Sequence, residues 1–142
     1  MNTFEQDLKR GITAEKKVLE IFKRQYPCAT MIDAFKGYDI WIPEISKSIE
    51  VKYDPMSNQT GNIVIEIEFN GIPSALMTTT ATWWVFSDDK VYVMIKPKKI
   101  IQCIFDNRLQ YVMFTGTGDT KSKKAFLIKK EMLFSYGEML SV

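Results

Sequence analysis

The fold of this chain is decided by a short stretch in its first half, Ser48-Ile49-Glu50-Val51-Lys52-Tyr53-Asp54. Apolar and charged residues alternate along it, which is the period of a β-strand with one buried face. The opposite face carries Glu50 and Lys52, two charges side by side on a strand that is otherwise typical of a protein interior. Such a pair requires either a neighbouring charge or a chemical role.

A second strand with an acid at its start lies just upstream, in Gly37-Tyr38-Asp39-Ile40-Trp41-Ile42. Its Asp39 precedes Glu50 by eleven residues. Turn residues around these runs predict strands at 29–34, 39–42 and 48–53. A strand at 62–69 follows the polar turn 55–61. We expect strands 48–53 and 62–69 to form a hairpin, with Glu50 across from Val64 or Glu66.

The first helix is predicted over residues 4–25, where apolar residues recur at helical spacing before Pro27. Glu15 lies three or four residues from Ile12, Val18 and Leu19. It is therefore expected on or beside the apolar face of the helix rather than opposite it. An ordinary surface acid beside Lys16 is the alternative for this residue.

The second half alternates strands and helices. A short helix is predicted over 71–80, strands over 81–87 and 91–95, a helix from Pro97, and strands over 109–114 and 125–133. We expect Trp83, Trp84 and the apolar stripe at 100–105 in the core or at a dimer contact rather than stacked on bases. The whole pattern predicts one α/β domain, residues 1–142, with a mixed central sheet flanked by helices.

Composition removes several kinds of chemistry. The chain has no histidine, which excludes serine or cysteine sites with a histidine base and histidine-ligated metals. Cys28 and Cys103 are far apart and in no zinc spacing, so we expect buried, reduced thiols. The sequence shows neither a secretory signal nor an apolar run of about 18 residues. The expected location is the cytoplasm, without membrane contact.

Charge is distributed unevenly along the chain. Residues 1–70 carry nine Lys/Arg and eleven Asp/Glu, a net of −2, whereas residues 71–142 carry ten and six, a net of +4. Lysines gather at 96–99, 121–124 and 129–130. The distribution is compatible with a polyanion lying over an acidic site, although solvated lysines on an ordinary surface give the same pattern.

The acid-x-Lys pattern occurs several times in the chain, so its context must select among the copies. Only Glu50 and Lys52 share one face of a strand beside another strand that begins with an acid. Asp39, Glu50 and the Val51 carbonyl can converge as oxygen ligands, which Mg²⁺ prefers, and Glu15 could reach the same ion or a second one. Lys52 would then orient a water and stabilise the transition state. The alternative for Glu50 and Lys52 is a surface ion pair.

Asp39, the eleven-residue gap, Glu50-Val51-Lys52 and the preceding helix with Glu15 resemble the PD-(D/E)XK nuclease superfamily. Its members include restriction endonucleases, Holliday-junction resolvases and small phage-type nucleases. The resemblance covers about residues 4–105, and residues 106–142 form an extension. It implies a restriction-endonuclease-like fold, dependence on Mg²⁺ (or Mn²⁺) without an organic cofactor, and hydrolysis of DNA phosphodiester bonds. Tyr38 stands where the name-giving proline would be.

The resemblance implies an endonuclease in which Asp39, Glu50 and the Val51 carbonyl bind metal, Lys52 is catalytic and Glu15 is an auxiliary ligand. A compact chain without a recognition domain favours branched DNA, cut by a homodimer in the manner of a Holliday-junction resolvase. Two alternatives stay open: a nuclease-like module that binds DNA or protein without cleavage, and an exonuclease or nicking enzyme on ordinary duplex. Further roles for Gln59, Glu66 and Glu68 are also open.

Overall fold

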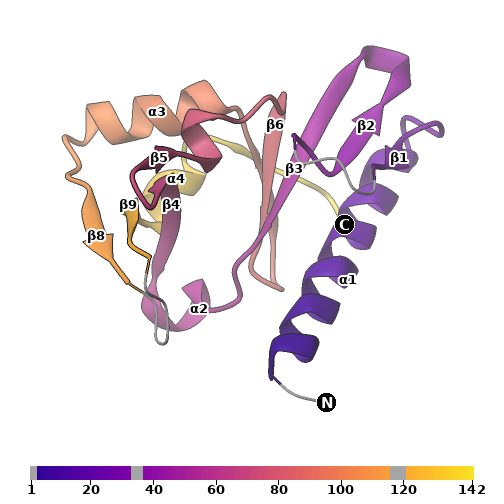
Figure 1. Ribbon diagram of the computed structural model, residues 1–142. Coiled ribbons are helices and arrows are strands. Elements are labelled where there is room, and N and C mark those ends of the chain that lie inside the picture. Colours follow the sequence, from indigo (N-terminus) through magenta and orange to yellow (C-terminus); the bar gives the residue numbers. More distant parts are fainter. Residues whose placement is uncertain (1–2, 33–36, 116–120) are drawn as a thin grey trace.

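The computed structural model describes residues 3–32, 37–115 and 121–142, which form an α/β domain with two sheets (Figure 1). The helices are α1 (Thr3–Lys23), α2 (Ser57–Thr60), α3 (Pro97–Asp106) and α4 (Lys130–Phe134), and 3₁₀ turns occupy Pro43–Ile45 and Ala75–Met77. The strands are β1 (Thr30–Met31), β2 (Ile40–Ile42), β3 (Lys47–Tyr53), β4 (Asn62–Phe69), β5 (Ile72–Pro73), β6 (Trp83–Ser87), β7 (Tyr92–Ile95), β8 (Val112–Phe114), β9 (Lys123–Lys129) and β10 (Glu138–Met139).

The larger sheet is mixed, as predicted. Its strand order is β1-β2-β3-β6-β7-β10, and β3 lies near its middle, antiparallel to β2 and parallel to β6. Glu50 is in register with Trp84, and Ile40 with Ile49. This arrangement brings the end of β2 that carries Asp39 beside the charged stretch of β3.

The predicted hairpin between β3 and β4 is wrong. The strand 62–69 exists with its predicted bounds, but it belongs to a second sheet of order β5-β4-β9-β8 and pairs along its length with β9. Glu50 therefore has no partner at Val64 or Glu66, which lie opposite Leu127 and Ala125. Alternation identified the buried face of β4, but both β3 and β9 offer a matching apolar face, so the pattern could not choose between them.

Two apolar clusters hold the elements together. On one face of the larger sheet, Val18 and Phe22 of α1 pack with Ile49, Val51 and Val85. The other cluster fills the space between the two sheets and α3, and its buried members include Trp84, Phe86, Ile63, Ile65, Ile100 and Ile128. Successive residues of β6 thus enter opposite clusters, which makes β6 the wall between them.

Other elements differ from prediction in detail. The expected helix over 71–80 is β5 followed by the 3₁₀ turn Ala75–Met77, and the expected strand over 125–133 ends at Lys129 and turns into α4. Cys103 is buried but Cys28 is exposed, because it follows Pro27 in the turn after α1. In the stripe on α3, Ile100 and Ile104 are buried, whereas Ile101 and Phe105 are exposed. Within the described ranges, no helix has the length and apolar character that crossing a membrane requires.

A polar clamp joins the two sheets at the turn between β6 and β7. Lys130 Nζ donates to Asp88 Oδ2 (2.8 Å) and to Asn58 Oδ1 (2.7 Å), and the Asp88 carboxylate is 5% exposed. Burial raises the pKa of Asp88, but hydrogen bonds from Lys130 and from the backbone of Val91 and Lys90 bring it below its ordinary value of 3.8. The ionised carboxylate is therefore the form that the fold stabilises.

Lys130→Met is expected to lower the free energy of unfolding by about 1–2 kcal/mol at pH 7, because Asp88 keeps its backbone donors but loses its counter-charge. The folded-state pKa of Asp88 is depressed, so its contribution is full above pH 3.8 and is lost as the pH falls further. The difference between Lys130→Met and wild type should thus shrink in acid. Urea unfolding at pH 7 and pH 3 measures it. Lys129→Met, an exposed neighbour, is the control and should change little.

Gly137 marks a close approach between the chain leading into β10 and β7. A Cβ built there would lie 2.5 Å from Ile95 Cγ1 and 2.7 Å from the Met94 carbonyl oxygen. Gly137→Ala is therefore expected to lower the free energy of unfolding by about 1–2 kcal/mol.

Gly11→Ala is the control with the opposite expected sign. Nothing lies within 4 Å of a Cβ built on Gly11 in α1, so this variant should raise the free energy of unfolding by about 0.5–1 kcal/mol. Thermal unfolding of both variants tests the pair.

Candidate active site

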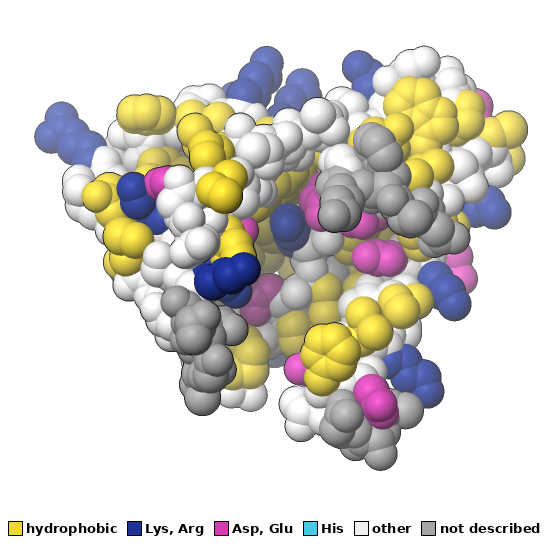
Figure 2. Space-filling model, in the orientation of Figure 1, with side chains coloured by type: hydrophobic (Ala, Val, Ile, Leu, Met, Phe, Trp, Pro, Cys, Tyr) yellow, Lys and Arg dark blue, Asp and Glu magenta, His cyan; other side chains and the backbone are white. Residues whose placement is uncertain are grey.

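The charged face of β3 opens into a cleft between the two sheets. The cleft is about 280 Å³ in volume, and its wall consists of Glu50, Lys52 and Trp84 with residues of the loop before β6 and of the turn before β2, namely Ala75, Thr78, Thr79 and Gly37. Figure 2 shows acidic and basic side chains gathered in the hollow between the α1 side and the α3 side of the molecule. The sequence-predicted pair therefore lies in a concave, polar place rather than on an open surface.

Lys52 is held by two contacts. Its Nζ lies 3.7 Å from Glu50 Oε1 and 4.8 Å from the centroid of the Trp84 ring. That ring is itself fixed, because it is buried and its Nε1 donates to Thr79 Oγ1 (3.0 Å). The lysine side chain is 36% exposed, so its ammonium group is placed beside the cleft and remains open to a ligand.

Asp39 directly precedes the first residue of β2 and lies beside β3. Its backbone N–H donates to the Ile49 carbonyl (2.8 Å), and its Oδ2 accepts from the Val51 N–H (2.7 Å). The Asp39 carboxylate therefore accepts the Val51 N–H bond that a backbone carbonyl of a longer β2 would otherwise accept. In antiparallel pairing a residue presents its N–H and C=O to the same neighbour, so the Val51 carbonyl faces the same edge as Asp39. Burial raises the pKa of Asp39, while the Val51 N–H and the charge of Lys52 lower it.

Glu50 is the most perturbed acid of the cleft. Burial and then the negative charge of Asp39 raise its pKa from 4.5 to about 7, Lys52 works in the opposite direction, and Glu15 adds a further, smaller increase. Glu15 is half-buried on α1. Acids from α1, from the start of β2 and from β3 therefore act on one another, and the fold holds more negative charge here than Lys52 neutralises.

The cleft offers a hard cation a small set of oxygen donors rather than a complete cage of side chains. The described ranges contain no group of three or more Asp, Glu, His or Cys side chains placed to hold a metal ion. The oxygen donors at the edge of β3 are two carboxylates, of Asp39 and Glu50, and the Val51 carbonyl. Mg²⁺ in proteins commonly uses one or two carboxylates together with waters and substrate phosphates, so this smaller set fits it.

The three other polar residues considered from the sequence do not line the cleft. Glu68 Oε2 lies 2.7 Å from Lys124 Nζ, and Glu66 Oε2 accepts from Ser74 Oγ (2.7 Å). Gln59 is exposed on α2. Sequence reasoning did not find Thr78 and Thr79 as cleft residues. Trp84 could have been identified from its place on β6 beside Glu50. That place follows from the parallel pairing of β3 with β6, which the sequence alone does not reveal.

Fold and cleft together define an α/β domain with a half-buried acid–lysine cluster on a mixed sheet. Comparison of the chain with protein-family models, with curated proteins and with solved structures found no significant match. The restriction-endonuclease-like assignment therefore stays a prediction that depends on the residues of the cleft.

Proposed function

We propose that this protein is a Mg²⁺-dependent endodeoxyribonuclease that hydrolyses DNA phosphodiester bonds in the cleft between its sheets. One observation carries the proposal: Asp39, which directly precedes β2, meets Glu50 and Lys52 at one edge of β3, and the pKa of Glu50 is raised to about 7. Half-burying carboxylates that repel each other costs stability, and this cost favours a chemical role for the cluster.

The roles follow from the positions of the side chains. Asp39, Glu50 and the Val51 carbonyl would hold the ion, with Glu15 as an auxiliary ligand from α1. When bound, Mg²⁺ supplies charge neutralisation for the phosphodiester and a more acidic water. Lys52, between Glu50 and the fixed Trp84 ring, orients the attacking water and stabilises the charge that develops on the phosphate oxygens.

The substrate we propose is branched DNA, such as a Holliday junction, cut by a homodimer whose two sites make two equivalent incisions. In this proposal, the shape of the DNA backbone rather than the base sequence would guide binding. Lysines on α3 and on β9 are available to contact phosphates. Lys124 and Lys130 contribute less, because they form ion pairs with Glu68 and Asp88.

The test uses labelled four-way junction, linear duplex and single-stranded DNA, each with Mg²⁺, Mn²⁺ or a chelator. Cleavage of the junction with either metal and none with chelator is the expected result. Product lengths separate internal incision from exonuclease action and from nicking of ordinary duplex. No cleavage of any DNA with either metal would contradict the proposal.

A second candidate is a nuclease-like module that binds DNA or a partner protein without cutting. It is favoured by the ion pair of Glu50 with Lys52 and by the lack, in the ranges that the structure describes, of a three-residue metal group. Equal binding of DNA with metal and with chelator, together with no products, would select this candidate over the enzyme.

A further inference from the structure

A second cleft lies on the face of β3 opposite to Glu50 and Lys52. Tyr53 directly follows Lys52, and alternation along the strand turns its ring to the face that α1 covers. The cleft, about 390 Å³ in volume, lies between the first half of α1, the end of β3 and the turn between β6 and β7. It is therefore separate from the candidate active site.

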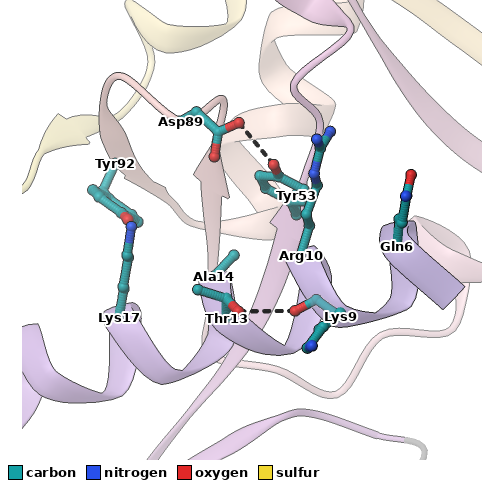
Figure 3. Close-up of a pocket in the computed structure, with 9 residues that line it drawn as sticks. All are labelled: Gln6, Lys9, Arg10, Thr13, Ala14, Lys17, Tyr53, Asp89 and Tyr92. Carbon is teal, nitrogen blue, oxygen red and sulfur yellow. Dashed lines mark hydrogen bonds between the residues drawn. The ribbon is translucent and has the colours of Figure 1, made fainter. Parts of the chain in front are cut away.

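The α1 wall of this cleft is basic. Arg10 and Lys17 are seven residues apart, so they lie on the same side of the helix about two turns from each other. Ala14 lies between them, and its small side chain leaves the space open. Figure 3 shows Arg10 beside Tyr53 and Lys17 rising toward Tyr92, with Lys9 at the border of the cleft.

In the described ranges, no carboxylate lies within ion-pair distance of Arg10 or Lys17. The three ion pairs there belong to Lys52, Lys124 and Lys130, and none includes Arg10 or Lys17. Asp89 is the one acid that lines the cleft, and its carboxylate accepts a hydrogen bond from the Tyr53 hydroxyl (2.7 Å). The charge of Asp7, one turn before Arg10 on α1, also acts on Tyr53. Lys9, Arg10 and Lys17 therefore stand against two acids, which still leaves an excess of one positive charge at the cleft.

We propose that this cleft binds the phosphate group of a small ligand. A guanidinium presents paired N–H donors that match two phosphate oxygens, and an ammonium group adds a second charge from the next turns of the helix. Arg10 and Lys17 supply these two groups, and the Tyr53 ring supplies an apolar surface for the rest of the ligand. The volume suits a ligand of nucleotide size. Because the cleft faces away from Glu50 and Lys52, the proposal stands apart from the proposed nuclease activity.

Calorimetric titration at low salt, without divalent cations, tests this site with three probes: inorganic phosphate, deoxyadenosine 5′-monophosphate and deoxyadenosine. We expect the monophosphate to bind at least ten-fold more tightly than the nucleoside. Binding of inorganic phosphate alone would show that the phosphate group suffices, whereas binding of only the monophosphate would show that the nucleoside contributes as well. Either of these results supports a phosphate site.

Arg10→Gln and Lys17→Gln should each weaken binding of the monophosphate about ten-fold, since each removes one charge-assisted contact. Lys16→Gln is the matched control, because Lys16 is exposed on α1 and does not line the cleft, and it should leave affinity unchanged. Circular dichroism confirms that each variant is folded. Equal affinity for nucleoside and monophosphate, no binding at millimolar concentration, or the same loss in Lys16→Gln would overturn the proposal.

Discussion

Lys52→Ala is expected to lower the rate of DNA cleavage by about 10²–10⁴-fold while the protein stays folded. The side chain is 36% exposed and its ion pair with Glu50 is 3.7 Å long, so the fold depends little on it. The reaction depends on it because the ammonium group is placed at the edge of the cleft where charge would develop. Single-turnover cleavage of the preferred DNA, with Mg²⁺ at saturation, measures the loss.

Lys47→Ala provides the matched control for that prediction. Lys47 begins the same strand, is exposed and lies away from the cleft. Lys47→Ala removes one positive charge from β3, as Lys52→Ala does, so a general weakening of DNA binding would appear in both variants. Wild-type cleavage in Lys52→Ala, or an equal loss in both, would remove the lysine from the catalytic role proposed here.

Several elements of this fold could be predicted because each of them carries a local signal. Alternation identified β3 and β4, helical spacing with Pro27 beyond it identified α1, and Pro97 marked the start of α3. Those signals depend on neighbours a few residues away. They also sufficed to place Asp39 next to Glu50, because β2 and β3 are adjacent along the chain and pair antiparallel.

Pairing between distant strands could not be predicted in the same way. The partner of β4 is β9, about 60 residues later, and the partner of β3 is β6, joined by a crossover that contains β4 and β5. One apolar face resembles another, so the choice is made by the total packing of the domain rather than by any single strand. For this reason Trp84 and Thr79 were absent from the predicted site, although they fix Lys52 in place.

Glu50→Gln is expected to raise the free energy of unfolding by about 2–3 kcal/mol at pH 8, while it abolishes cleavage. The folded-state pKa of Glu50 is about 7, against 4.5 in the unfolded chain, because burial and the charge of Asp39 disfavour ionisation. Between those values the folded protein binds more protons than the unfolded chain. Wild-type stability therefore falls as the pH rises from 4.5 to 7, and the amide, which has no proton to lose, avoids that fall.

The gain from Glu50→Gln should thus be present at pH 8 and absent at pH 4, as urea unfolding at both values would show. Glu20→Gln, an exposed acid on the same helix as Glu15, is the control and should change stability little at either pH. Mg²⁺ adds an independent readout. An ion that binds the folded state stabilises it by mass action, so Mg²⁺ should raise the melting temperature of wild type and not of Glu50→Gln. If Glu50→Gln were less stable than wild type at pH 8, Glu50 would be a structural partner of Lys52. A residue that serves chemistry at a cost in stability shows the opposite sign, because its replacement makes the folded state more stable.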